Sequence, residues 1–160
     1  MITTLIFDFS RVILFPRDKK YLGGLNKLHD ELSAKAGYNF LDYFELNDRL
    51  LALLEKMKER YDLYVFTTGH IQNVPEVKKR ISRIFKEIYS VEQIPFDKKD
   101  PRGYSFVAEK LHHAPHEILY IDDTIQNITV AKLAGFHTLV FKNNDQLLKA
   151  LRKFCRDQFR

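Results

Sequence analysis

The feature that most constrains the fold of this 160-residue chain is a set of four short apolar runs. The runs lie at residues 4–9, 63–67, 118–121 and 138–141. Each is nearly continuous in apolar residues, which is typical of strands that are buried on both faces of a parallel sheet. Helical patterns separate the runs, as crossover connections between parallel strands require. The sequence therefore predicts an α/β fold with a doubly wound (Rossmann-like) parallel sheet.

Apolar side chains recur at helical spacing between the predicted strands. In residues 47–60, four apolar side chains share one helical face, and Asn47 or Asp48 is available to cap the helix. Pro75 can occupy the first turn of another helix, and Gly135 stands where a helix would end in a left-handed residue. The expected helices lie at about 47–60, 75–85, 104–111 and 124–134, with a last one from about 145.

The pattern changes between residues 16 and 44, where glycines flank a short helical piece at residues 25–36. We interpret this segment as a small cap insert within a single domain that spans residues 1–160, because the chain length fits one domain. The insert carries several aromatic side chains that either pack against one another or form a platform for a substrate. Packing within the insert is the favoured interpretation.

Composition and charge limit the partners and the location that we expect. The net charge is +5, but Lys and Arg are spread along the chain, so we predict a solvated surface and no nucleic-acid partner. No segment reaches the ~20 apolar residues of a membrane span, and the N-terminus does not resemble an export signal. The single cysteine, Cys155, cannot form an internal disulfide, which fits a reducing cytoplasm. Oligomeric state is not indicated by the sequence.

Carboxylates follow two of the predicted strands directly. Asp8 lies where the first apolar run begins to end, and Asp122 and Asp123 follow the run at residues 118–121. In a parallel α/β sheet, the carboxyl ends of the strands border the ligand crevice. Carboxylate oxygens from two such strand ends make a site that is suited to Mg²⁺.

Hydroxyl and ammonium groups stand at two further points along the chain. Thr67 and Thr68 come at the end of the run at residues 63–67, and Lys98 begins the segment Lys-Lys-Asp-Pro. A hydroxyl, a backbone turn and an ammonium are the groups that an anionic phosphoryl group needs around it. Together with the carboxylates, they predict a phosphate site.

The order Asp, Thr, Lys, Asp-Asp resembles the four motifs of the haloacid dehalogenase superfamily over about residues 3–141. The lysine motif of the family is similar to residues 98–104 (KKDPRGY), where Lys99 replaces the usual proline. The acidic motif is similar to residues 121–128 (IDDTIQNI), which are followed by Ala131 and by Ala-Gly-Phe at 134–136. These two stretches make the resemblance specific.

The resemblance implies roles for the phosphate-binding residues. Asp8 would be the nucleophile that forms an aspartyl-phosphate, and Thr67, with Thr68 beside it, would bind the phosphoryl oxygens. Lys98, rather than Lys99, would neutralise charge on both groups. The implied activity is magnesium-dependent hydrolysis of a small phosphorylated molecule.

The resemblance also implies a ligand set for magnesium. Asp8, Asp123 and the main-chain carbonyl of Ser10 would bind the ion. Asp122 would be either a further ligand or an acceptor behind the ligands. The expected cofactor is therefore Mg²⁺.

Ser10 departs from the family pattern. Family phosphatases place a second Asp two residues after the nucleophile, where it protonates the leaving alcohol and then activates the hydrolytic water. A serine hydroxyl cannot replace it, and such acid–base catalysis is typically worth ~10²–10⁴-fold. Two alternatives therefore stay open. One is a catalytically weakened domain that binds a phosphorylated ligand or a protein partner, and the other is a dehalogenase-like or phosphonatase-like hydrolase, because those branches also lack this Asp.

Overall fold

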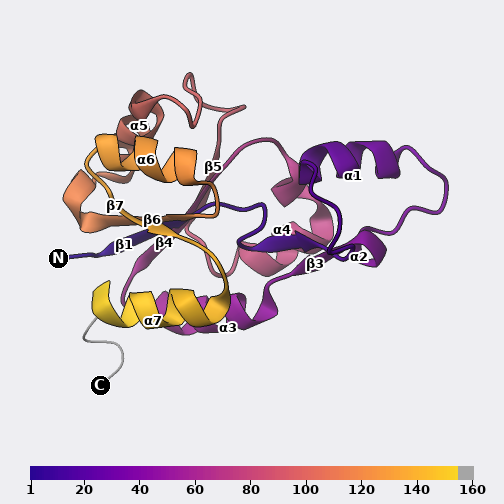
Figure 1. Cartoon of the computed structure of the whole chain (residues 1–160), viewed down its shortest axis with the longest axis horizontal. Coiled ribbons are helices and arrows are strands. Elements are labelled where there is room, and N and C mark those ends of the chain that lie inside the picture. Colours follow the sequence, from indigo (N-terminus) through magenta and orange to yellow (C-terminus); the bar gives the residue numbers. More distant parts are fainter. Residues whose placement is uncertain (155–160) are drawn as a thin grey trace.

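Five parallel strands form the central sheet, in the spatial order β5-β4-β1-β6-β7 (Figure 1). The computed structural model describes residues 1–154. The strands are β1 (Thr4–Phe7), β4 (Asp62–Thr67), β5 (Glu87–Ser90), β6 (Ile118–Asp122) and β7 (His137–Val140). β1 is central, since Leu5 pairs in register with Leu63 on one side and with Leu119 on the other. The predicted α/β fold with a doubly wound parallel sheet is confirmed.

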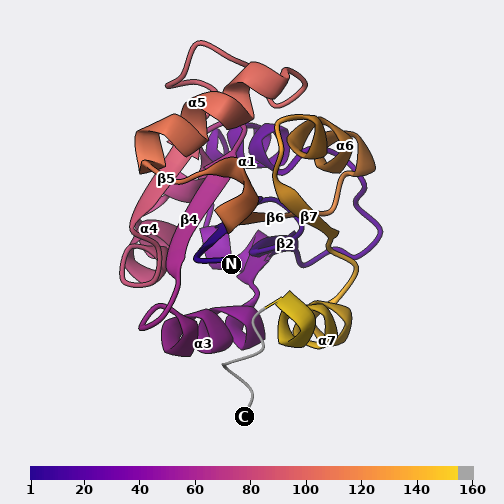
Figure 2. The ribbon, with the colours of Figure 1, turned by 90° about the vertical axis from the view of Figure 1, so that its left-hand side faces the viewer.

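Helices cover both faces of this sheet (Figure 2). One face carries α3 (Asp48–Met57), α4 (Pro75–Ile81) and α7 (Asn144–Phe154), and the other carries α5 (Pro101–Leu111) and α6 (Ile125–Leu133). Successive residues of β1 supply the two cores, because Leu5 and Phe7 pack in the first and Ile6 packs in the second. Burial on both faces explains why the strand sequences are continuously apolar. Short 3-10 helices lie at Ile71–Asn73 and Pro115–Glu117.

The first strand is shorter than the prediction of residues 4–9. β1 ends at Phe7, and the chain then turns sharply, since the N–H groups of Ile13 and Leu14 both donate to the carbonyl of Phe9. Phe9 itself is fully buried, which is why its run of apolar residues extends beyond the strand. The turn places Asp8 at the very end of the central strand.

Several other elements differ from the prediction, since α3 ends at Met57 and not at residue 60, and α5 begins at Pro101 and not at residue 104. β5 has no predicted counterpart, because it is an edge strand of four residues in which only Tyr89 and Ser90 are buried. The second predicted helix is too long, because α4 ends at Ile81 and the N–H groups of Ile84 and Phe85 turn back to the Ile81 carbonyl. Both apolar side chains after the turn enter the core, so their pattern mimics a longer helix.

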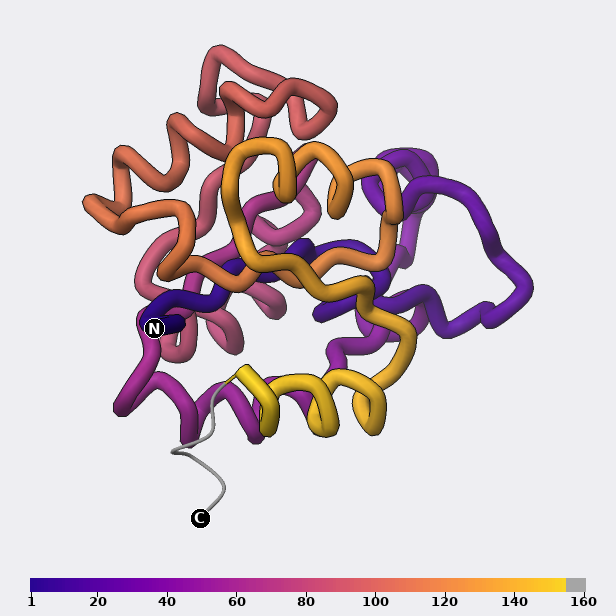
Figure 3. The backbone as a smooth tube through the Cα atoms, turned by 60° about the vertical axis from the view of Figure 1, so that its left-hand side comes forward, coloured from indigo at the N-terminus to yellow at the C-terminus, as the bar shows by residue number. Residues whose placement is uncertain are grey.

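The segment that we interpret as a cap insert lies between two strands of a separate antiparallel sheet, β2 (Leu14–Pro16) and β3 (Phe44–Leu46). It contains α1 (Leu25–Ser33) and α2 (Phe40–Tyr43). The backbone trace shows this segment beyond the carboxyl end of β1, away from the N-terminus (Figure 3). Aromatic rings stack within it, with centroids 5.6 Å apart for Tyr38 and Tyr43 and 4.7 Å apart for Phe40 and Phe44.

Two expectations concern the chain as a whole. Within residues 1–154, no helix combines the length and the apolar character that a membrane span needs. Cys155 lies outside the described residues. The expectation that it forms no internal disulfide therefore stays a prediction.

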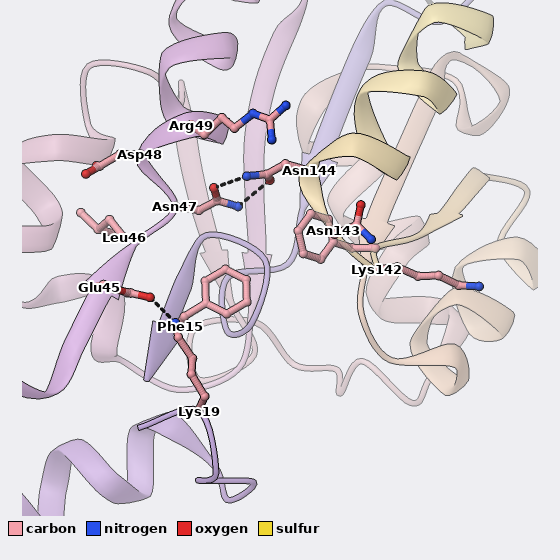
Figure 4. A pocket seen from close by; sticks show the side chains of 11 residues that line it. Phe15, Lys19, Glu45, Leu46, Asn47, Asp48, Arg49, Lys142, Asn143 and Asn144 are labelled. Atoms are coloured by element: carbon pink, nitrogen blue, oxygen red, sulfur yellow. Dashed lines mark hydrogen bonds and ion pairs between the residues drawn. The ribbon is translucent and has the colours of Figure 1, made fainter. Parts of the chain in front are cut away.

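Asn47 joins three segments near the start of α3 (Figure 4). Its Oδ1 accepts a hydrogen bond from the Leu50 N–H at 3.2 Å, so Asn47 caps the helix. The amides of Asn47 and Asn144, at the start of α7, exchange two hydrogen bonds of 2.8 Å. The Asn47 Nδ2 also donates to the carbonyl of Val12 at 2.9 Å, in the turn that follows Asp8.

Replacing Asn47 by alanine should lower the free energy of unfolding by about 2 kcal/mol, because a helix cap and three further half-buried hydrogen bonds are lost together. Urea denaturation measures the change. Asn73→Ala removes an exposed amide and is the matched control, which should stay within about 0.5 kcal/mol of the wild type. Equal stabilities for the two variants would show that the Asn47–Asn144 pair contributes nothing.

Candidate active site

The carboxyl ends of three neighbouring strands place the predicted site residues at one edge of the sheet. Asp8 follows β1, Thr67 ends β4 and Asp122 ends β6, and β1 lies between the other two strands. The N–H of Asp8 donates to the Ile121 carbonyl at 2.8 Å, which continues the strand pairing to this residue. The sheet therefore holds the backbone of Asp8 in a fixed position at the end of β1.

Lys98 connects the two strand ends. Its Nζ donates to Asp8 Oδ1 at 2.5 Å and to Asp122 Oδ2 at 3.1 Å. The residue is 2% exposed, whereas the adjacent Lys99 is exposed to solvent. The ammonium also lies over the rings of Phe66 and Tyr120, 5.4 and 5.5 Å from their centroids. Lys98 is thus the lysine that faces the carboxylates, in the register that the sequence predicts.

Asp122 is fully buried and its oxygens are already occupied. Oδ2 accepts hydrogen bonds from Lys98, from the Tyr120 hydroxyl and from Asn127 Nδ2, and Oδ1 accepts one from the Thr124 N–H. Burial favours the neutral acid, but the charge of Lys98 and these donors outweigh it and lower the pKa of Asp122. The arrangement makes Asp122 a fixed anion that orients Lys98.

The pKa values of Asp8 and Asp123 are shifted in the opposite direction, upward. Burial raises the pKa of Asp8 to about 7, although the Lys98 charge opposes the change. Burial and the charge of Asp122 also raise the pKa of Asp123. Three carboxylates and one ammonium leave a net negative charge when all are ionised. A cation bound between the carboxylates would balance it.

The donor set fits a hard divalent cation. Asp8, Asp122 and Asp123 each offer a carboxylate oxygen, and these oxygens lie within 4.8 Å of one another. Oxygen ligands are what Mg²⁺ prefers. Because the oxygens of Asp122 already accept four hydrogen bonds, Asp8 and Asp123 are better placed to give up their oxygens to an ion.

A cavity of about 510 Å³ opens above these groups. The structure brings five of the predicted site residues into its lining, namely Asp8, Ser10, Thr68, Lys98 and Asp123. Two others lie outside this lining: Asp122 is beneath Lys98, and Thr67 is 1% exposed with its hydroxyl donated to the Thr68 carbonyl at 3.2 Å. The cavity wall is completed by residues 22–27 of the insert and by Arg11, Thr124 and Asn127.

Asn26 lines the cavity as well, although it is not among the predicted site residues. Its Oδ1 accepts hydrogen bonds from the N–H groups of His70 and Ile71 at 2.9 and 2.8 Å, and its Nδ2 donates to the Thr68 carbonyl at 3.2 Å. These contacts hold the loop after β4 against α1. A half-buried asparagine has no local pattern that would predict partners more than forty residues away.

A second cavity, of about 460 Å³, lies between the two-stranded β2–β3 sheet and the start of α7 (Figure 4). Its lining contains none of the predicted site residues. Two of its cations already have carboxylate partners, since Lys19 contacts Glu45 and Arg49 contacts Asp145 at 2.6 Å. The cavity above Asp8 is therefore the candidate active site, because five of the predicted site residues line it and none of them lines the second cavity.

Comparison with known proteins agrees with this fold. The model of the haloacid dehalogenase-like hydrolases matches residues 16–135, so the chain belongs to this hydrolase family. The matched range begins after Asp8 and Ser10. Enolase-phosphatase E1 of Klebsiella pneumoniae (strain 342) is 28% identical over 103 residues, which cover 61% of this chain and 44% of that protein. The chain therefore spans less than half the length of this relative.

Solved structures of the haloacid dehalogenase (HAD) family share the fold. A predicted HAD-like family hydrolase from Porphyromonas gingivalis has a TM-score of 0.69 at 18% identity, with 99% of this chain and 100% of that chain covered. A wild-type HAD family enzyme from Bacteroides thetaiotaomicron, in complex with magnesium and inorganic phosphate, has a TM-score of 0.63 at 18% identity. That match covers 89% of this chain and 95% of the other. Both chains are nearly the length of this one.

Proposed function

We propose that this hydrolase is a magnesium-dependent phosphatase that acts on a small phosphorylated molecule through an aspartyl-phosphate on Asp8. The observation that carries the proposal is the buried Lys98 ammonium, held between Asp8 and Asp122 at the edge of an open cavity. A nucleophilic carboxylate, a fixed cation and a further carboxylate converge there, as phosphoryl transfer requires. The relatedness to an enolase-phosphatase supports the choice of phosphate esters as substrates.

Each residue of the site has a separate role in the proposed reaction. Asp8 attacks phosphorus and expels the alcohol, and the aspartyl-phosphate is then hydrolysed by water. Lys98, held in place by Asp122, stabilises negative charge on the transferring group. Thr68 lines the cavity and binds phosphoryl oxygens. The buried Thr67 hydroxyl joins it by exchanging its hydrogen bond to the Thr68 carbonyl for one to the phosphoryl group.

The metal would be held by Asp8, Asp123 and the carbonyl of Ser10. Bound Mg²⁺ would supply Lewis-acid stabilisation of the phosphoryl oxygens. Asp122 would act behind the ligands, because its own oxygens are taken by four donors. The magnesium in the Bacteroides thetaiotaomicron structure supports the choice of ion.

We further infer a single domain over residues 1–160 in which residues 16–44 act as a small cap. Residues 22–27 of this segment line the cavity while the site stays open on other sides, which suits a small substrate. The spread of basic residues supports a protein without a nucleic-acid partner. A cytoplasmic location remains part of this proposal.

A second candidate function uses the same site for binding, with little or no catalysis. Ser10 favours it, because a hydroxyl supplies neither the acid nor the base of the family phosphatases. In this version the chain binds a phosphorylated ligand or a protein partner and turns over slowly. Steady-state phosphate release, compared with binding of the same ester, distinguishes the two functions.

Magnesium affinity tests the proposed ligand set. Asp123→Ala should weaken Mg²⁺ binding at least ~10-fold in calorimetry, because a direct carboxylate ligand is lost. Phosphate release from an aryl phosphate should fall in parallel, and chelation of the metal should abolish it in the wild type. Asp145→Ala removes a carboxylate that is exposed at the start of α7 and should leave Mg²⁺ affinity unchanged. If Asp123→Ala binds Mg²⁺ like the wild type, the ligand assignment is wrong.

A further inference from the structure

The charges that line the active-site cavity are unevenly arranged. The carboxylates are Asp8 and Asp123, which the proposed function assigns to the metal, and the cations are Lys98, Arg11 and Lys27. Lys98 is committed to Asp8 and Asp122. Two cations of the lining, Arg11 and Lys27, are therefore left over after the catalytic groups are accounted for.

Arg11 is held firmly at the cavity wall. Its backbone is in the left-handed region, with φ of 62°, and its N–H donates to the Leu14 carbonyl at 2.7 Å. Its Nη2 donates to the carbonyls of Tyr21 and Gly23 at 3.0 and 2.8 Å. Within residues 1–154, no carboxylate lies within 4.0 Å of the guanidinium, and its described side-chain hydrogen bonds use Nη2 alone. Two carbonyls therefore hold the Arg11 guanidinium at the cavity wall, and no carboxylate of residues 1–154 pairs with its charge.

Lys27 comes to the same cavity from the first turn of α1. Its Nζ lies 3.9 Å from Glu31, and its side chain is 77% exposed. An ion pair that is this long and this exposed contributes little. The Lys27 ammonium can exchange it for an anionic ligand at small cost.

We propose that Arg11 and Lys27 bind a second anionic group of the substrate. The substrate class is then a phosphate ester that carries a carboxylate or a second phosphate besides the group that Asp8 attacks. This inference rests on the proposed function of the Asp8 site. It deepens that function, because a phosphoryl group at Lys98 leaves these two cations free for the rest of the molecule.

Two matched ligands test the inference by calorimetry in saturating magnesium. Glycerol 3-phosphate and 3-phosphoglycerate share a carbon skeleton and a phosphate, and differ by a neutral CH₂OH against a carboxylate. The wild type should bind 3-phosphoglycerate about tenfold more tightly, which is the sum of two modest charge contacts. Arg11→Gln and Lys27→Gln should each lower this ratio about threefold.

Control variants separate a local contact from the general charge of the protein. Arg17 belongs to the same insert and donates to the Leu41 carbonyl at 2.6 Å, but it does not line the cavity, and the exposed Lys20 does not line it either. Arg17→Gln and Lys20→Gln should keep the wild-type ratio. Lys27→Gln is the decisive variant if Arg11→Gln loosens the loop that Arg11 tethers, because Lys27 has no such structural role.

The outcomes distinguish this inference from the proposed function. Binding of glycerol 3-phosphate with a ratio near one, or an unchanged ratio in Lys27→Gln, would overturn the second-anion site and leave the phosphatase proposal intact. Failure of both esters and of inorganic phosphate to bind would overturn the proposed function, and this inference with it. A ratio that falls equally in the control variants would show only nonspecific attraction and would also overturn the inference.

Discussion

Lys98→Met should lower phosphate release by about 10³-fold, because the variant loses a fixed charge at the transferring group and the group that keeps Asp8 ionised. Burial already raises the pKa of Asp8 to about 7 with Lys98 in contact. Without the ammonium, the charge of Asp122 acts on Asp8 unopposed, and the pKa of Asp8 rises further. In the metal-free protein at neutral pH, a larger fraction of Asp8 is then the protonated acid, which does not attack phosphorus.

The same change should also destabilise the fold. Removing one member of a buried ion pair leaves its partners uncompensated, and we expect the free energy of unfolding to fall by about 3 kcal/mol at pH 8. An acid whose pKa is raised in the folded state loses stability as pH rises from its unfolded value of 3.8 through its folded value. The deficit of Lys98→Met should therefore shrink between pH 8 and pH 5, where Asp8 becomes protonated.

Lys99→Met is the matched control, because Lys99 is the exposed neighbour in the same turn. Chelator-treated samples should be used for the urea unfolding curves, so that metal binding does not enter the comparison. Equal losses of activity in the two variants, or a Lys98→Met deficit that grows toward acid pH, would contradict the account of the buried lysine.

Ser10→Asp should raise steady-state hydrolysis by about 10–10³-fold, because it restores the leaving-group acid and the water-activating base. Ser10 lines the cavity together with Asp8, so a carboxylate at this position reaches the same space. In the wild type, esters with good leaving groups should suffer least, since an aryl oxide barely needs a proton. Breakdown of the aspartyl-phosphate still lacks its base. The wild type should therefore show a burst followed by slow turnover.

Phosphate release from an aryl phosphate and from a sugar phosphate measures both parts of this prediction. The gain in Ser10→Asp should be larger for the sugar phosphate, whose leaving group needs the acid. Ser33→Asp adds the same charge at an exposed position in the insert and should change neither rate. No gain in Ser10→Asp, with full metal affinity retained, would mean that the site solves acid–base catalysis in another way.

The parallel sheet and the order of the motifs are predictable from sequence because both have local signals. A strand buried on two faces is continuously apolar, and Asp8 and Asp122 stand at the ends of such strands. The strands β2, β3 and β5 have only three or four residues each, so their pairing depends on the rest of the fold. Only tertiary structure brings Asn26 to the loop that follows β4.

The roles of Asp122 and Arg11 also become clear only from the three-dimensional structure. Sequence spacing leaves Asp122 as either a metal ligand or a supporting acceptor, and only the four donors around it favour the second role. The sequence does not fix the role of Arg11 either, because a solvated arginine and an arginine that contacts substrate have the same local pattern. Its two carbonyl partners and its place in the cavity wall come from the folding of the insert.

Rapid-quench mass spectrometry can show whether the Asp8 carboxylate accepts the phosphoryl group, which is the step on which the proposed function depends. Wild type, Asp8→Asn and Ser10→Asp are mixed with an aryl phosphate and magnesium, stopped in acid and digested. The account predicts one phosphoryl group on the peptide that contains Asp8 in the wild type, because slow breakdown lets the intermediate accumulate. The label should be weaker in Ser10→Asp, where breakdown is faster, and absent in Asp8→Asn. Magnesium-dependent phosphate release by an Asp8→Asn variant, or a phosphoryl group found on another residue of the wild type, would contradict it.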